Sequence, residues 1–321
     1  MSSLLSRFAE NAYWMARYVE RAENVARILD VNETFARDSS GTSDWLPVLQ
    51  LNSDEERFFK RHKRASANEV LHFYVADAAN PTSVVSAVRM ARENARSIRH
   101  IVSTEMWVQL NVFHNRLMRL KRTDYMPGNL SRACDAIKEA CQTHAGVVEG
   151  TLYRDQALRF AYLGRYLERA DQSSRLIDIA YRRVLSRSDD GIGPIDSGEW
   201  NSVLRLASGY HAFRRTHPGD TTPQNVAAFL MFDRRFPRSM AACVQGVDFN
   251  LKRLHSEFGL RISPPLRAIL RELSAHVRRR AASRLFDDAD LHGSMDEFQK
   301  TLISCDTRLG IDYFGQEAGE G

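Results

Sequence analysis

The sequence predicts an all-α fold, a duplicated helical bundle with two pseudo-equivalent halves packed together. Apolar residues recur at spacings of three and four along most of the 321 residues, which is typical of helices with one buried face. Alternating apolar and polar residues, which would indicate strands, are absent. Glycine (17) and proline (9) are sparse, so few segments are interrupted. A similar sequence also recurs after about 150 residues, which is the size of a domain.

The expected helices follow one another along the chain. The first covers 4–36, where Met15, Val19 and Leu29 lie on one apolar face. A second apolar stripe runs from Val84 to Val102. The same spacing predicts further helices over 104–121, 130–150, 152–186, 197–216, 223–232, 238–256, 264–286 and 294–309.

Loops are expected where glycine, proline, serine and aspartate gather, at 36–47, 122–129, 186–198 and after Phe314. Pro81 and Pro237 fit the first turn of a helix, because a missing N–H costs nothing there. The predicted domains are a first repeat over 1–150, a second repeat over 151–314 and a disordered tail over 315–321.

The repeat is clearest in one segment that aligns without a gap. RYVERAENVARILDV (17–31) matches RYLERADQSSRLIDI (165–179) at an offset of 148. Further matches follow in the same order at slowly growing offsets, Trp45 with Trp200 and then 65–83 with 221–239. The identical pairs in the first match are Arg17/Arg165, Tyr18/Tyr166, Glu20/Glu168, Arg21/Arg169, Ala22/Ala170, Arg27/Arg175 and Asp30/Asp178.

Charge, hydropathy and cysteine usage exclude several classes. The net charge of +5 is mild despite 39 arginines beside six lysines, so we expect no nucleic-acid partner. No apolar run is long enough to cross a membrane, and the N-terminus does not resemble a signal peptide. The four cysteines are scattered, which is typical of a reduced, cytoplasmic protein. Cys134 and Cys141 lie seven residues apart and suit buried thiols on one helix face.

Common catalytic and metal-binding motifs are missing. The chain has no HExxH, CxxC, GxSxG or Walker motif, and no two of its ten histidines lie four residues apart. We therefore expect no metal site and no cofactor. The basic run Arg278, Arg279, Arg280 and Arg284 is interpreted as a solvated helix end, with binding of an acidic partner or nucleic acid as the alternative.

The repeated segment carries the main candidate site. Its arginines and glutamates share one side of a helix, and three interpretations stay open: a structural ion-pair network, a ligand or active site, and a partner surface. An arginine fork binds carboxylate or phosphate, and Glu20 or Glu168 is a candidate catalytic base. Ala16 and Gly164 beside the motif suit close approach of another helix. The candidate ligand- or partner-binding residues are Arg17, Tyr18, Glu20, Arg21, Asn24, Arg165, Tyr166, Glu168 and Arg169.

A second constellation, Glu105, Trp107 and Asn111, follows Ser103 and Thr104, either of which can cap a new helix. Glu105 would lie near the positive end of that helix, and Trp107 and Asn111 one turn apart. The alternatives are a core tryptophan with a polar neighbour and the wall of a pocket.

The segments NAYWMARYVERAEN (11–24), ENARSIR (93–99) and STEMW (103–107) resemble the bacterial alpha-E domain family, an all-helical family with a Glu-Arg motif. The resemblance covers nearly the whole chain and includes the second copy, RYLERAD. The family pattern has Leu, Gly and Leu where this chain has Ala12, Ala16 and Val19, and the charged positions are kept.

The resemblance implies companions and a kind of chemistry. Members resemble partners of circularly permuted ATP-grasp ligases and transglutaminase-like proteases encoded nearby, which implies peptide synthesis or amide-bond modification. It also implies that Arg17, Tyr18, Glu20 and Arg21, with their repeats, are the functional residues.

We therefore expect a subunit or accessory factor of an ATP-grasp-type peptide or amide ligase, with an Arg/Glu cluster that binds a carboxylate, an acyl-phosphate or the partner. The first alternative is an enzyme that itself forms or cleaves amide bonds through Glu20 or Glu168. The second is a pure helical scaffold. The residues do not decide whether the chain is itself an enzyme.

Overall fold

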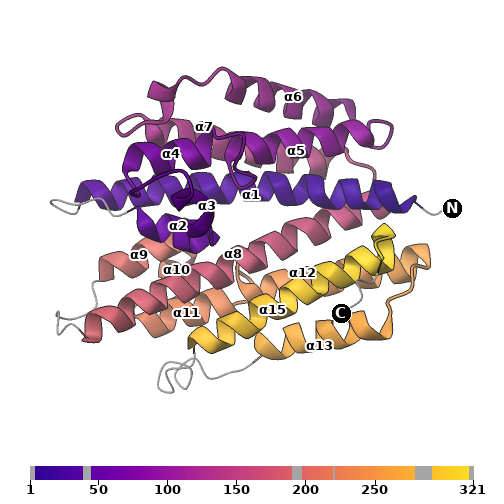
Figure 1. Ribbon diagram of the computed structural model, residues 1–321. Helices are drawn as coiled ribbons and strands as arrows, with labels where there is room; N and C mark the ends of the chain where they lie inside the picture. Colours follow the sequence, from indigo (N-terminus) through magenta and orange to yellow (C-terminus); the bar gives the residue numbers. More distant parts are fainter. Residues whose placement is uncertain (1–3, 39–44, 190–196, 220, 279–290, 318–321) are drawn as a thin grey trace. The chain divides into compact units, whose positions relative to one another are not determined.

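The computed structural model describes residues 4–38, 45–189, 197–219, 221–278 and 291–317, and in these ranges every regular element is a helix (Figure 1). The predicted all-α class is therefore confirmed. Contacts divide the chain into two compact units. The first unit is Asn11–Gly164, and the second is Arg165–Gly321 together with Met1–Glu10. No helix in the described ranges is both long enough and apolar enough to cross a membrane.

Both units contain one long helix, then three short ones, then longer ones. In the first unit α5 packs on α6 and α6 on α7, and in the second α12 packs on α13 and α13 on α15. The first unit holds α1 (Ser6–Asp38) from Asn11 onward, α2 (Leu46–Asn52), α3 (Glu55–Phe59), α4 (Ala67–Val75), α5 (Val84–Ser97), α6 (Thr104–Met118), η1 (Arg122–Tyr125), α7 (Leu130–Thr151) and the first residues of α8 (Gln156–Asp189). The second holds the rest of α8, α9 (Ser197–Leu206), α10 (Tyr210–Thr216), α11 (Pro223–Phe232), α12 (Met240–Phe258), α13 (Pro264–His276), α15 (Leu291–Leu309) and η2 (Gly310–Phe314).

Serine caps begin equivalent helices in the two units. The Ser83 hydroxyl accepts a hydrogen bond from the Ser86 N–H (3.2 Å) at the start of α5, and Ser239 accepts one from the Ala242 N–H (3.0 Å) at the start of α12. The expectation for the two prolines was wrong. Each lies two residues before its capping serine, outside the first turn, because the serine side chain is needed to satisfy the first free N–H groups.

One predicted helix, 197–216, is instead two helices. The chain breaks between α9 and α10, where Ser208 adopts a left-handed backbone conformation with φ of 58°. A non-glycine residue rarely takes this conformation, so sequence periodicity alone gave no sign of the break.

Aromatic rings form the same cluster in each unit. In the first unit the Phe58 ring stacks on His62 (4.5 Å between centroids) and meets Phe73 edge-on (5.2 Å). Such edge-on and offset pairs add to the stability gained from burial of the rings. The second unit repeats the stack (4.6 Å) and the edge contact (5.4 Å) with Phe213, His217 and Phe229.

Cys134 and Cys141 are buried, as their spacing predicted. All four cysteines are free thiols, and burial raises the pKa of the Cys134 thiol above its ordinary value. The matched tryptophans Trp45 and Trp200 are also fully buried. Equivalent positions thus hold large core side chains in both units.

Parts of some predictions lie outside the described residues. These include Arg279, Arg280 and Arg284 of the basic run, and residues 318–321 of the expected tail. Within the described part of that tail, the Gln316 side-chain amide donates to the Glu10 carboxylate (3.0 Å).

Candidate functional site

In the first unit, α1 buries the glutamate of its Arg-Tyr-x-Glu-Arg segment. Glu20 is only 4% exposed and Asn24 only 5% exposed, although both lie on the polar side of the helix. The neighbouring Arg17, Tyr18 and Arg21 are partly exposed. The polar side of α1 at this segment is therefore not a solvated face.

Aromatic rings position both arginines of this segment. Arg17 Nη1 donates to the Tyr13 hydroxyl (3.1 Å), and its guanidinium lies 4.9 Å from the centroid of the Trp14 ring. The Tyr18 ring is next to Trp14 (5.6 Å between centroids), and the Arg21 guanidinium lies 5.6 Å from the Tyr18 centroid. Cation–π contacts of this kind restrict the movement of the guanidinium groups.

A glycine lets α8 approach α1 closely at this point. A Cβ atom on Gly164 would lie 2.2 Å from the carbonyl oxygen of Tyr13 and 3.1 Å from Cγ of Arg17. No side chain fits in that space, so the predicted close approach of a helix at Gly164 is confirmed. The contact fixes the backbone of α1 one turn before Arg17.

In the second unit, α8 holds the repeated segment differently. Glu168 is 1% exposed, while Arg165 and Arg169 are partly exposed, as in the first copy. The Tyr166 ring, however, lies directly over Gly246 of α12, where a Cβ atom would be 2.7 Å from the ring. Tyr166 therefore serves as a packing contact between α8 and α12.

One ion pair recurs in both copies. Arg27 Nε donates to Glu23 Oε1 (3.1 Å) on α1, and Arg175 Nε donates to Asp171 Oδ2 (2.9 Å) on α8. Each pair joins residues one turn apart and begins three residues after the buried glutamate. Such pairs add about 0.3–0.5 kcal/mol to a helix.

The second predicted constellation is brought together in part. Asn111 Oδ1 accepts from Arg92 Nε of α5 (2.7 Å), and Asn111 Nδ2 donates to the Trp107 carbonyl (2.7 Å). The Arg92 guanidinium also covers the Trp107 ring at 5.3 Å, so these two side chains join α6 to α5. Ser103 caps α6, as predicted, and Glu105 is exposed in its first turn.

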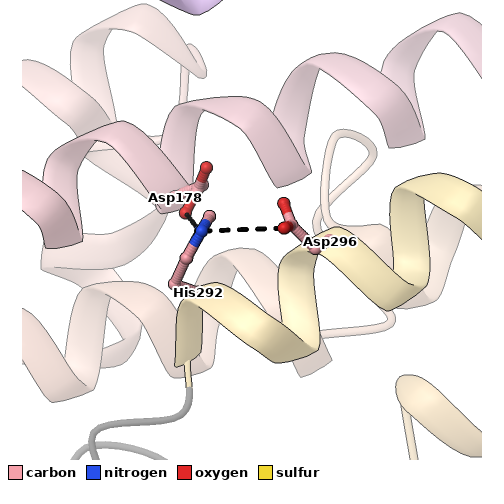
Figure 2. A group of neighbouring side chains, drawn as sticks. All are labelled: Asp178, His292 and Asp296. Atoms are coloured by element: carbon pink, nitrogen blue, oxygen red, sulfur yellow. Dashed lines mark hydrogen bonds and ion pairs between the residues drawn. The ribbon is translucent and has the colours of Figure 1, made fainter.

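The structure adds a group of side chains that the sequence did not suggest. Figure 2 shows His292 of α15 between two carboxylates: its Nδ1 is 2.6 Å from Asp178 Oδ1, and its Nε2 is 3.6 Å from Asp296 Oδ2. One ligand atom from each of the three lies within 4.8 Å of the others. Two signals exist in the sequence, the Asp30/Asp178 match and the four-residue spacing of His292 and Asp296.

The chain matches the model of the Alpha-E family over residues 4–314. That family is described as a predicted alpha-helical domain with a conserved ER motif. The chain belongs to the Alpha-E family. In this Alpha-E protein, Glu20-Arg21 and Glu168-Arg169 are the Glu-Arg dipeptides of the repeated segment.

Similar proteins occur in mycobacteria. The Alpha-E chain is 23% identical over 297 residues to the uncharacterized protein Mb2597 of Mycobacterium bovis and to the uncharacterized protein Rv2567 of Mycobacterium tuberculosis. Each match covers 85% of this chain and 32% of the relative, so the chain spans about a third of the length of these relatives. No solved structure matches the chain.

Proposed function

We propose that this Alpha-E protein is a subunit or accessory factor of an ATP-grasp-type peptide or amide ligase. The Arg-Tyr-x-Glu-Arg segments of α1 and α8 bind a carboxylate, an acyl-phosphate group or the ligase itself. The observation that carries the proposal is the same in both units: a buried glutamate, Glu20 or Glu168, beside partly exposed arginines.

The chemistry of these groups supports an anion-binding role. Burial of a carboxylate costs several kcal/mol unless charged and hydrogen-bonding groups compensate it. A fold that buries one in both copies of a segment therefore uses it to orient neighbouring groups. The guanidinium group of an arginine carries paired N–H donors, whose geometry matches the oxygens of a carboxylate or an acyl-phosphate.

The lengths of the relatives support action together with other protein. Only 32% of each mycobacterial relative is matched. In these relatives the matched part is therefore joined to further polypeptide of about twice its length. The resemblance to alpha-E companions of ATP-grasp ligases suggests which class of partner to test.

Co-purification tests the partnership. A tagged chain is co-expressed with an ATP-grasp ligase encoded beside its gene, and elution and ATP-dependent amide formation are measured. We expect both to depend on the chain, and we expect Arg17→Lys, which keeps the charge and loses the fork, to weaken the effect about tenfold or more. Glu139→Gln, an exposed change on α7, is the control. A ligase that neither binds the chain nor changes its rate would refute the proposal.

The same material tests the chain as an enzyme in its own right. If the chain alone forms or cleaves amide bonds, Glu20→Gln or Glu168→Gln should abolish turnover with little change in the melting temperature. A large loss of stability without any turnover to lose would instead indicate a structural ion-pair network.

A further inference from the structure

We propose that Asp178, His292 and Asp296 bind a divalent transition-metal ion in the second unit. The three residues bring two carboxylates and one imidazole together from α8 and α15 (Figure 2). This inference is independent of the proposed function, because it uses none of the arginines and glutamates on which that proposal rests.

In the first unit a lysine lies between two such carboxylates. There the Lys138 ammonium contacts Asp30 Oδ2 at 2.7 Å and Asp135 Oδ1 at 2.8 Å. Burial alone would lower the pKa of Lys138, but its hydrogen bonds to Asp135 and Asp30 outweigh burial and raise it. The pair of acids therefore holds a cation.

The same pair of acids exists in the second unit. Asp30 matches Asp178 in the aligned segment. At an offset of 161 residues, all eight buried positions of α7 coincide with the eight of α15, and Asp135 then matches Asp296. Both carboxylates therefore have an equivalent in the other unit. The pair joins α1 to α7 in the first unit and α8 to α15 in the second.

The residue that contacts both acids differs between the two units. At the same offset, Lys138 matches Gln299, a neutral amide, and His292 matches Ser131. A divalent ion bound by the imidazole and the two carboxylates would bring to the second unit the positive charge that the Lys138 ammonium brings to the first. Because imidazole is a metal ligand and an ammonium is not, the second unit can accept a metal where the first cannot.

The donor set and its exposure fit a first-row metal. Imidazole suits Zn²⁺ better than Mg²⁺ or Ca²⁺, carboxylates also suit Mn²⁺, and one imidazole with two carboxylates makes a three-ligand set of the kind common in proteins. Tetrahedral ligands with bonds of about 2.1 Å lie about 3.4 Å apart, which small side-chain rotations can reach from separations within 4.8 Å. The Asp178 side chain is 11% exposed, while His292 (38%) and Asp296 (44%) face solvent in part. One anchored ligand and two accessible ones leave room for water or a substrate oxygen.

Titration of the metal-free chain tests the site. The full chain, without an affinity tag and stripped with EDTA, is titrated with Zn²⁺ and Mn²⁺ by calorimetry and by thermal unfolding. We expect one saturable site per chain for at least one ion, a matching rise in melting temperature, and weaker binding of Mg²⁺. Absence of binding by both Zn²⁺ and Mn²⁺ would overturn the proposal and leave the cluster as an imidazolium ion pair.

Two variants locate the ion. His292→Lys places an ammonium between the acids, as in the first unit, and should weaken binding about tenfold or more while the metal-free chain keeps its stability. Asp296→Asn, on the more exposed side of the cluster, should also weaken metal binding. The exposed His211→Ala is the control. Binding that survives both variants would place the metal elsewhere and refute the site.

A transplant tests the equivalence directly. The double variant Ser131→His/Lys138→Gln gives the first unit the donor set of the second, and we expect the stoichiometry to rise from one ion per chain to two. An unchanged stoichiometry in a folded double variant would overturn the equivalence of the two carboxylate pairs on which the proposal rests.

Discussion

The two units of the chain share an aromatic cluster and differ at one charged position between two acids. The stacked ring pair of Phe58 and His62 returns as Phe213 and His217 at nearly the same separation. Lys138, in contrast, has no lysine counterpart. A substitution within a close-packed core costs several kcal/mol, whereas a partly exposed charge can be exchanged at small cost. The aromatic cluster is therefore kept in both units, whereas Lys138 of the first unit is replaced by Gln299 in the second.

The largest predicted effect concerns the two glycine contacts. Gly164→Ala should destabilise the protein by about 2–4 kcal/mol, because its Cβ would meet the Tyr13 backbone, which cannot move alone. Gly246→Ala should cost about 1–2 kcal/mol, since the Tyr166 ring can shift and alanine favours the helix. Urea denaturation measures both.

Gly146→Ala is the matched control, because a Cβ there meets nothing within 4 Å. It should be neutral or stabilise by up to about 1 kcal/mol, as expected in a helix interior. Equal losses for Gly164→Ala and Gly246→Ala would contradict the difference between a backbone contact and a side-chain contact.

The next largest loss of stability is expected for Lys138, which lies between two acids in the first unit. Lys138→Met leaves Asp30 and Asp135 facing each other without compensation and should cost about 1–2 kcal/mol. The folded pKa of Lys138 is raised, so this contribution is present below the ordinary lysine pKa and is lost only as the pH rises through the higher folded value. Denaturation at pH 7 and above pH 10.5 separates the two states. The exposed Lys300→Met should leave stability unchanged.

Much of the fold could be predicted because long helices have strong periodicity. The helix expected at 130–150 is α7 within one residue, and the helix expected at 238–256 is α12 within two. The short helices α2, α3 and α4 were not expected, since segments of five to nine residues carry too little periodicity to recognise. Their order was implied only by the match to the second half.

The site was harder to predict, for a physical reason. Helical spacing places Glu20 on the polar side of α1, and only the folded chain shows that this side is buried there. Asp178 and His292 are 114 residues apart, so no local pattern joins them. The sequence signal for this cluster is the identity of Asp30 and Asp178, because polar residues that stay the same in two otherwise diverged copies indicate positions with the same role.

A smaller effect, present in both units, is expected at the serine caps. Ser83→Ala and Ser239→Ala should each cost about 1 kcal/mol for the lost acceptor of a helix N–H. Ser239→Ala should cost more in total, because the Ser239 hydroxyl also donates to the Asp233 carbonyl (2.5 Å). The double variant should lose the sum, since the caps belong to different units. A smaller loss for Ser239→Ala than for Ser83→Ala, measured by thermal unfolding, would show that the units do not share this start of the helix. Thr104→Ala, one residue after the Ser103 cap, is the control.

The smallest expected effect is a pH dependence confined to the first unit. Burial and the nearby Arg122 lower the pKa of His72, whose Nδ1 lies 3.0 Å from the Tyr125 hydroxyl. The unfolded chain therefore binds more protons below about pH 6.5, and stability falls as the pH drops through that value. The counterpart in the second unit is Ala228. Hydrogen exchange at pH 7.5 and pH 5 should show α4 losing more protection than α11, and His72→Ala should remove the difference. Equal losses in α4 and α11 would assign the acid sensitivity to groups common to both units.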